Sequence, residues 1–341
     1  MLTLSPGDRR ILELNGRNVI LSVAFFPDGK HLVSGGWEGV LRRWQVQDSR
    51  EVGRSINTGP TICGISASKD GNWTVAADRG VMVVVNAKTD ERVVTQNAHA
   101  NQWVRDVDIS PDSTRFATAS DDRTACIWSI TTGHRLVGPM THDSAVIAVK
   151  YSPRGDRIAT ATVRTTNSVR IFDSQSGQLL HIFPSAMPIG YEYCTPLSWS
   201  NTNQLFVGST GRIFCFDGLT YSLLSEWTVR SGGLPSIALS SNGRFIACAI
   251  ERSISIWDTS TRQRIGPIIE DPQVVYCIAI SPDNMFLASG GHNTMIMLRS
   301  LRDFLPQGYL TSDVSILSSI DGVFILDRPD FQSAPVVLVM F

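Results

Sequence analysis

The sequence contains no apolar run approaching the ~20 residues that a membrane-spanning helix needs. Residues 1–10 lack the apolar stretch of a secretory signal. The 341 residues include 30 basic and 31 acidic side chains, so the formal charge is −1 and no overall field attracts phosphate backbones. We therefore expect a cytoplasmic protein, with a nuclear location also open, and neither a membrane nor nucleic acid as its main partner.

The sequence also lacks the common motifs of catalytic and cofactor sites. It has no GxGxxG after a strand, no GxxxxGK[ST] and no GxSxG, which excludes the usual phosphate-binding loops and nucleophile elbows. Six histidines occur without HExxH, and six cysteines without CxxC. We expect no metal and no cofactor, and interpret the cysteines as small buried residues of a reducing compartment.

What the chain does have is a repeat. Each copy comprises an apolar strand, a turn rich in Pro, Asp, Asn or Gly, a strand of small residues, a second turn, and a strand ending in an aromatic or large apolar residue. Aligned on that last residue, the spacings are 41, 43, 44, 44, 41 and 41, and the aligned positions are Trp44, Val85, Trp128, Phe172, Phe216, Trp257 and Leu298. A period of roughly 40 to 45 residues is typical of one four-stranded propeller blade per repeat. The sequence therefore predicts an all-β, seven-bladed β-propeller.

The third repeat illustrates the physical basis of this pattern. We expect strands over Trp103–Ile109, Arg115–Ser120 and Thr124–Ile130, with Ser110–Asp112 as the first turn. First strands are nearly continuous apolar runs, because neighbouring blades cover both faces of an innermost strand. Small residues in second strands, such as Ser34–Gly36, allow close approach of adjacent blades.

The ring must close, because an open ring would leave exposed sheet edges. Ile11–Leu14 precedes the first repeat as other outermost strands precede theirs, so we expect it to complete the last blade. A competing strand over Asp303–Leu310 is disfavoured by Pro306, which cannot donate in a ladder interior. The prediction is one propeller over residues 1–300 and an extension over 301–341, which either packs on the propeller or acts as a partner-binding or dimerising strand.

These repeats resemble the WD40 repeat family, including its fungal members, across nearly all of residues 1–300. The resemblance implies a hydrogen-bonded structural tetrad in the third repeat, formed by His99, Thr118, Asp122 and Trp128. Elsewhere the set is altered, with Arg17 and Glu38 in the first repeat and Asn293 in the seventh. A hydroxyl, an imidazole and a carboxylate also compose a hydrolase triad, but the resemblance places them inside a packed blade without room for substrate. We therefore predict a structural role and no catalytic residue.

The same resemblance places the ends of first strands, and the turns between second and third strands, on the top face, where partners usually dock. The predicted partner-binding residues are Trp37, Trp103, Arg105, Asp121, Arg164, Tyr193, Glu251, Tyr276 and His292. Aromatic residues and arginine are enriched in binding hot spots. Two alternatives stay open: Trp103 can pack over its own blade, and Arg105 can pair with Asp106 or Asp121. The insertion Pro184–Tyr193 can equally be a flap over the channel.

The function predicted first is a non-enzymatic scaffold or adaptor whose partners are other proteins or peptides. A second hypothesis is a detached sensor propeller of a NACHT-type signalling protein. A third, of another class, is a propeller enzyme such as a lactonase or quinoprotein dehydrogenase, which needs carboxylates or metal ligands converging on the channel. Asp106 and Asp108 alone do not suffice for it. The sequence does not determine the oligomeric state.

Overall fold

The computed structural model describes residues 11–15, 17–163, 168–183, 196–230, 233, 235–292 and 294–310, with a short strand pair at 324–325 and 337–338. Strands dominate this part. Its helical turns are all 3-10 in type, namely η1 (His99–Asn101), η2 (Leu301–Asp303) and η3 (Gln307–Tyr309). No helix within these ranges is long and apolar enough to cross a bilayer. The prediction of an all-β fold is confirmed.

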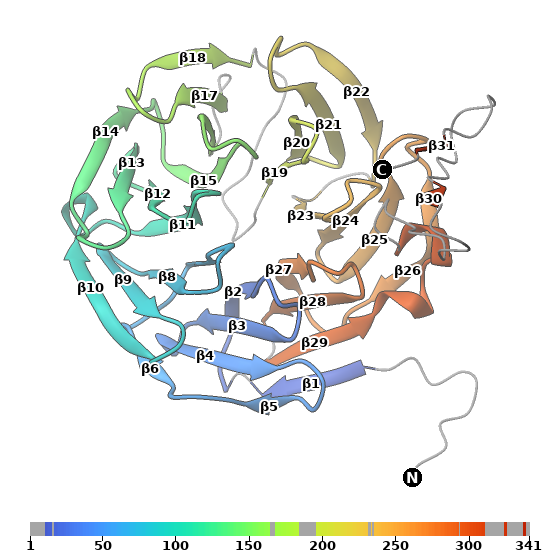
Figure 1. Cartoon of the computed structure of the whole chain (residues 1–341), viewed down its shortest axis with the longest axis horizontal. Coiled ribbons are helices and arrows are strands. Elements are labelled where there is room, and N and C mark those ends of the chain that lie inside the picture. The colour runs from blue at the N-terminus through green and yellow to red at the C-terminus, as the bar shows by residue number, and fades with distance from the viewer. Residues whose placement is uncertain are drawn as a thin grey trace.

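Seven antiparallel sheets stand around a central axis, as predicted (Figure 1). Blade 1 consists of β2 (Ile20–Phe25), β3 (His31–Gly36), β4 (Val40–Gln45), β5 (Arg50–Glu51) and β6 (Ile56–Asn57). Blade 2 consists of β7 (Gly64–Ala67), β8 (Trp73–Ala77), β9 (Val81–Asn86) and β10 (Glu91–Asn97). Blade 3 consists of β11 (Val104–Ile109), β12 (Arg115–Ser120), β13 (Thr124–Ser129) and β14 (Arg135–Thr141). Blades 4 and 5 consist of β15 (Val146–Tyr151), β16 (Arg157–Thr162), β17 (Val169–Asp173) and β18 (Leu179–Ile182); and β19 (Leu197–Trp199), β20 (Gln204–Ser209), β21 (Arg212–Asp217) and β22 (Leu223–Thr228).

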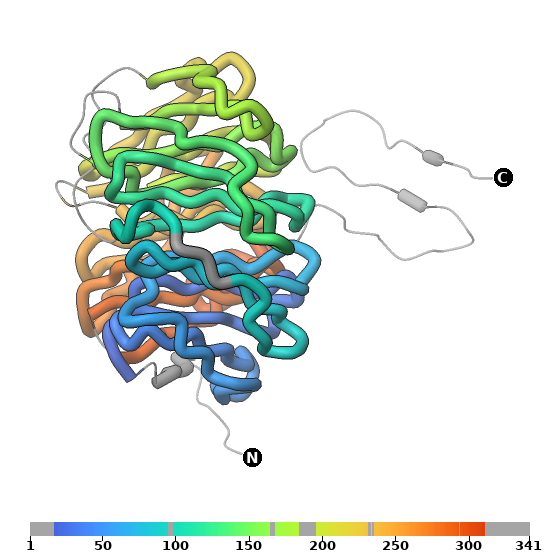
Figure 2. The backbone as a smooth tube through the Cα atoms, turned by 90° about the vertical axis from the view of Figure 1, so that its left-hand side faces the viewer, coloured from blue at the N-terminus to red at the C-terminus, as the bar shows by residue number. Residues whose placement is uncertain are grey.

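Blade 6 consists of β23 (Ser236–Leu239), β24 (Phe245–Ile250), β25 (Ser253–Asp258) and β26 (Arg264–Glu270). Blade 7 contains β27 (Val275–Ile280), β28 (Phe286–Gly291) and β29 (Met295–Ser300), together with one strand from the start of the chain. A separate pair is formed by β30 (Phe324–Ile325) and β31 (Val337–Leu338). Figure 2 shows the same ring of blades from its side.

That extra strand is β1 (Ile11–Asn15), which pairs antiparallel with β29 from Ile11 opposite Arg299 to Asn15 opposite Met295. It covers the outer edge of blade 7, beside the first blade (Figure 1). The predicted closure by an N-terminal strand is therefore confirmed. The competing segment from Asp303 to Leu310 forms the turns η2 and η3 instead of a strand.

The hydrophobic core lies between adjacent blades. Val84 of blade 2, for example, belongs to the same buried cluster as Phe116 and Trp128 of blade 3. The glycines of the second strands allow this close packing, as predicted. A Cβ on Gly35 would lie 2.7 Å from the Ile62 side chain, and one on Gly290 would lie 2.5 Å from that of Ile20.

The first ten residues after the last repeat pack on the propeller. Leu301 and Phe304 join the core cluster of blades 6 and 7. The Tyr309 hydroxyl donates to Asp258 Oδ2 at 2.5 Å, and the Asn242 side chain donates to the carbonyl of Tyr309 at 2.9 Å. The proposed division at residue 300, and the role of the segment as a whole, stay predictions.

One position of the predicted repeat alignment is wrong. In blade 3 the aligned residue Trp128 pairs with Phe116, the second residue of the second strand. In each of the other five of the first six repeats, the aligned residue also pairs with the second residue of the second strand. In blade 7 the residue opposite Leu287 is Arg299, not Leu298. The sequence search for a large apolar residue missed this because a buried arginine occupies the aromatic position.

Candidate functional site

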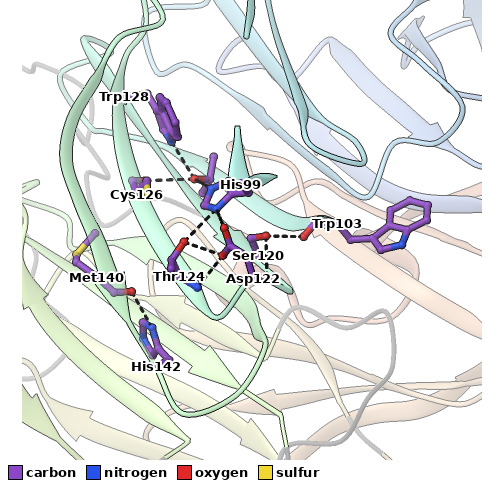
Figure 3. A network of polar contacts seen from close by, with 10 residues as sticks. His99, Trp103, Ser120, Asp122, Thr124, Cys126, Trp128, Met140 and His142 are labelled. Atoms are coloured by element: carbon purple, nitrogen blue, oxygen red, sulfur yellow. Dashed lines mark hydrogen bonds and ion pairs between the residues drawn. The ribbon is translucent and has the colours of Figure 1, made fainter. Parts of the chain in front are cut away.

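The four side chains predicted as a tetrad in blade 3 are linked in one chain of hydrogen bonds (Figure 3). The Trp128 indole N–H donates to Thr118 Oγ1 at 2.9 Å, and Thr118 Oγ1 lies 2.7 Å from His99 Nε2. The other ring nitrogen, His99 Nδ1, lies 2.8 Å from Asp122 Oδ2. Because a carboxylate only accepts, Nδ1 carries a proton, and in the neutral imidazole Nε2 then accepts the hydroxyl proton of Thr118.

The centre of this network is buried, with 1% of the His99 side chain and none of Thr118 exposed, while Asp122 is partly exposed. Burial raises the pKa of Asp122, but hydrogen bonds from His99 and Thr124 outweigh that effect and hold the pKa below its usual value. The Thr118 hydroxyl is enclosed between the indole and the imidazole, so no substrate carbonyl reaches it. The geometry suits a structural element.

Other blades have different polar side chains at the position that the tetrad occupies in blade 3, and the tetrad motif did not identify them in the sequence. In blade 4, His142 Nε2 lies 2.8 Å from Thr160 Oγ1 and Nδ1 lies 3.0 Å from the Met140 carbonyl. The sequence signal was available, since His142 follows the outer strand of blade 3 as His99 follows that of blade 2. In blade 1, Arg42 binds Glu38, the residue predicted at the acidic position, with both N–O distances at 2.8 Å.

Blade 7 uses an ion pair. Arg299 donates to Asp271 Oδ2 at 2.9 Å and to Ser289 Oγ at 2.7 Å, and Ser289 donates to the same carboxylate at 2.8 Å. All three residues are at most 4% exposed. Asn293, the residue predicted at the acidic position of this blade, lies outside the described residues.

Strand pairing brings the predicted partner-binding residues to one end of their blades. Val104, at the start of a first strand, pairs with Ser120, at the end of a second strand. The start of each first strand, and not its end as predicted, therefore shares the top face with the turn between second and third strands, because antiparallel pairing places the end of the first strand beside the start of the second. The described residues of the predicted site lie here: Trp37, Trp103, Arg105, Asp121, Glu251, Tyr276 and His292. Arg164 and Tyr193, like the insertion Pro184–Tyr193, lie outside the described residues.

Trp103 is the centre of an aromatic and cationic group on this face. Its ring lies 5.7 Å from the Arg105 guanidinium carbon and 5.9 Å from that of Arg79. Its carbonyl accepts a 2.9 Å hydrogen bond from Ser120, while the indole points away from the tetrad (Figure 3). Sequence reasoning missed Arg79, although it occupies the turn of repeat two that corresponds to the turn bearing Asp121.

Packing around this ring crosses four blades. Trp103 and Tyr276 are partly buried against a cluster formed by Val19, Leu21 and Cys63. Trp103 therefore packs against the neighbouring blades rather than over its own blade and remains partly accessible, and its role in partner binding stays a prediction. Burial raises the pKa of Cys63 to about 12, so its thiol does not act as a nucleophilic thiolate near neutral pH.

The remaining predicted residues differ in accessibility. Arg105 forms the predicted pair with Asp121, with N–O distances of 2.8 and 2.5 Å. Trp37 is 47% exposed on the turn between β3 and β4. Glu251 is exposed and lies 3.8 Å from Arg230, and the ring of His292 is centred 6.4 Å from that of Tyr276.

A cavity of about 430 Å³ opens at the opposite end of the axis, lined by the inner strands and the turns that follow them. Asp106 and Asp108 face it with Lys150, which sequence reasoning did not single out. Lys150 Nζ lies 2.9 Å from Asp106 and 3.9 Å from Asp108. The two carboxylates also accept backbone N–H groups of blade 4, from Val149 at 3.1 Å and Tyr151 at 2.8 Å. They thereby connect the inner strands of two blades.

Burial raises the pKa of Asp108 to about 6, against the opposing effect of Lys150. Within the described ranges, no three His, Cys, Asp or Glu residues are grouped so that they could hold a metal ion. The five cysteines in these ranges are buried free thiols.

Known proteins resemble this chain in sequence. The profile of the WD domain, G-beta repeat, matches residues 9–45, 90–129 and 266–300, which contain the tetrad, the Arg42–Glu38 pair and Arg299. Minichromosome loss protein 1 of Schizosaccharomyces pombe is 26% identical over 320 residues, covering 90% of this chain and 38% of that protein. The periodic tryptophan protein 2 homolog of Dictyostelium discoideum is 24% identical over 310 residues, covering 89% of this chain and 32% of that protein. The chain thus spans well under half the length of these relatives.

The fold is also found among solved structures. The Cps50 (Swd1) β-propeller domain of Myceliophteria thermophila superposes with a TM-score of 0.71 at 18% identity, covering 83% of this chain and 96% of that domain. The seven sheets around the axis and the three matched segments both indicate a propeller built from WD40 repeats. Three segments of this chain are therefore WD40 repeats, and its described residues fold as a seven-bladed β-propeller of the WD40 type.

Proposed function

We propose that this propeller is a non-enzymatic scaffold or adaptor that binds other proteins on its top face. The observation that carries the proposal is the group around Trp103, where an accessible aromatic ring is flanked by two arginines beside an apolar patch. Such a combination suits a binding hot spot, because it offers a large rigid surface and directional donors at modest entropic cost. WD40 propellers typically serve as scaffolds, which supports this choice.

The arrangement of charges supports the choice over an enzyme. Thr118 and His99 are enclosed in blade 3, and the channel carboxylates are engaged by Lys150 and by backbone amides. A propeller hydrolase or dehydrogenase would need free catalytic groups converging on a substrate. The accessible chemistry of the top face is that of recognition.

The test compares the partners captured by the wild-type chain with those captured by the triple variant Trp37→Ala, Trp103→Ala, Arg105→Ala. We expect the triple variant to lose most specific partners, as measured by affinity purification and quantitative mass spectrometry. The matched control changes three residues of the β10 edge, Arg92→Ala, Val93→Ala and Glu91→Ala, and should keep its partners. An unchanged partner set for the folded triple variant would refute the top-face site.

A second candidate function is that of a sensor propeller from a larger signalling protein. It is favoured by 26% identity over 203 residues to apoptotic protease-activating factor 1 of Rattus norvegicus, which cover 57% of this chain and 16% of that protein. If it holds, the captured set should be one activating ligand or protein, and the triple variant should lose that one. Capture of several partners that bind simultaneously would favour the scaffold.

A further inference from the structure

Blade 6 lacks the polar bridge that blades 3, 4 and 7 form with their preceding blades. Val229 stands where blade 4 has His142 and blade 7 has Asp271, because each backbone N–H bonds the carbonyl of the residue before the third strand of the preceding blade. Cys248 occupies the place of the second-strand hydroxyl, as the fourth residue of β24. Because a valine side chain neither donates nor accepts hydrogen bonds, it cannot bridge to this position.

A cavity of about 380 Å³ opens beside these two residues, between blades 5 and 6, and we call it the side groove. Ile250 and Trp257 also line it. The indole N–H of Trp257 donates to Ser255 Oγ in its own strand at 2.8 Å, whereas that of Trp128 donates to the second-strand hydroxyl of blade 3. Trp257 is only partly buried, so its ring forms an accessible apolar wall. The volume lies in the range of roughly 300–1,000 Å³ that is usual for ligand sites.

The rim of the side groove carries one cation that is not neutralised. Arg230 donates to Ser253 Oγ at 3.0 Å and Ser253 donates to Glu270 at 3.1 Å, which links these two charges. Arg264 also lines the groove, and its guanidinium forms no ion pair with an acidic side chain in the described part of the chain. It stands opposite Trp257 in the pairing of β25 with β26. A guanidinium beside an aromatic ring suits a carboxylate that adjoins an apolar group.

We propose that the side groove binds a short peptide segment of a partner protein, which inserts one large apolar side chain against Trp257 and pairs an adjacent carboxylate with Arg264. The exposure of the groove favours a peptide over a small molecule. Arg264 and Ile268 line it and are exposed, Ile268 by 43%, so a bound group keeps one side open to solvent. Small-molecule sites instead bury roughly 70–90% of the ligand surface. A side chain that projects from a peptide leaves the peptide backbone on this open side.

The side groove is separate from the proposed top-face site. It is lined by residues of blade 6 and of the segment that follows β22, whereas the aromatic and cationic group is centred on Trp103 at the start of blade 3. A scaffold needs two separate sites to hold two partners at once, and the side groove supplies a second one. The groove does not depend on the top-face site, so each can be tested without the other.

The experiment selects a random dodecapeptide library, displayed on phage, against the full chain. We expect the enriched peptides to share a large apolar residue next to an acidic one, and fluorescence anisotropy of the labelled synthetic peptides measures their affinities. The double variant Val229→His, Cys248→Thr introduces into blade 6 the pair that His142 and Thr160 form in blade 4. It should keep its melting temperature and weaken binding at least about 10-fold, because an imidazole then occupies the groove.

A second variant tests the carboxylate contact without changing the core. Arg264→Glu should weaken binding of the same peptides at least about 10-fold, because it brings like charges together. The matched control is Arg135→Glu, because Arg135 is also exposed and stands opposite Trp128 as Arg264 stands opposite Trp257. This control should bind the peptides as tightly as the wild type.

Three results would overturn the proposal. They are a selection that enriches no peptide, enriched peptides without an acidic residue, and peptides that bind Arg264→Glu as tightly as Arg135→Glu. The triple variant Trp37→Ala, Trp103→Ala, Arg105→Ala should still bind the selected peptides. Peptides that lose affinity for this triple variant, but not for the groove variants, would belong to the top face and would count against the side groove. Failure of either site is therefore distinguishable from failure of the other.

Discussion

Blades 3 and 7 use two different sets of polar side chains to form hydrogen bonds with a buried hydroxyl of their second strand. Each has a hydroxyl at the centre of its second strand, Thr118 in one and Ser289 in the other. In blade 3 an imidazole bridges that hydroxyl to a carboxylate, and the indole of Trp128 donates to it. In blade 7 a guanidinium replaces the indole, and a carboxylate replaces the imidazole.

The difference shows what the architecture requires. In both blades a polar side chain from the segment after the outer strand of the preceding blade must bond the hydroxyl of the second strand, because a buried polar group without a partner is costly. The chemical identity of the group is not constrained. A search for one fixed set of residue types therefore finds fewer blades with a hydrogen bond to this hydroxyl than the structure contains. The contact of His142 with Thr160 in blade 4 is a further example. The two solutions differ in charge, and this difference can be measured.

The largest effect is expected for Asp271→Ala, which leaves Arg299 buried without its carboxylate. Breaking a buried ion pair on one side typically lowers the free energy of unfolding by about 3–5 kcal/mol. Chemical denaturation measures this loss. The double variant Asp271→Leu, Arg299→Met should recover most of it, because no charge then remains buried and only the neutral Ser289 hydroxyl loses its partners. Asp143→Ala, which removes the exposed partner of Arg170, is the control and should cost about 1 kcal/mol or less. Equal losses for Asp271→Ala and this control would contradict the prediction.

A smaller, pH-dependent effect is expected from blade 4. Burial, together with the nearby Arg170, lowers the pKa of His142 from 6.5 to about 4. Between these values the unfolded chain binds a proton that the folded chain does not, so stability falls as the pH decreases from 6.5 toward 4. The loss amounts to about 3 kcal/mol at most. His142→Asn should flatten this part of the curve of unfolding free energy against pH, and an unchanged slope between pH 6.5 and 4 would contradict the prediction.

His99→Ala should have an effect of about 2 kcal/mol, because it removes hydrogen bonds to Thr118 and Asp122 and leaves buried polar groups unpaired. The expected result is a lower melting temperature in a scanning experiment. Thr118→Val should give a loss of similar size, since His99 and Trp128 then lose their common partner. A variant that kept its melting temperature but lost a hydrolytic activity would instead support a catalytic role.

The smallest effect is expected from Asp122, which is partly exposed. Because its pKa lies below the usual value, its contribution is present above the unfolded pKa of ~3.9 and is lost as the pH falls through the folded value. Asp122→Asn should therefore reduce the steepness of acid unfolding below pH 4, by less than His142→Asn changes the curve above it. An unchanged acid limb would show that the carboxylate does not contribute to blade 3.

The architecture was accessible from the chain alone because its signals are local. The period of the repeats, the turns that follow the first strands, and the Ser-Gly-Gly segments all act within one blade or on its neighbour. The closing strand was predictable for the same reason, since Ile11–Asn15 occupies the place that an outer strand has in every repeat. The tetrad of blade 3 followed from the family resemblance, because all four residue types are present.

Three-dimensional packing decided the features that depend on contacts between distant residues. Arg299 resembles a surface residue in the chain, yet it lies 2% exposed beside Asp271, 28 positions away. The grouping of Arg79 with Trp103, and of Lys150 with Asp106, likewise arises when blades meet around the axis. Periodicity reports which side of a strand is buried, but not which charge is neutralised there, because that depends on a partner brought in by the neighbouring blade.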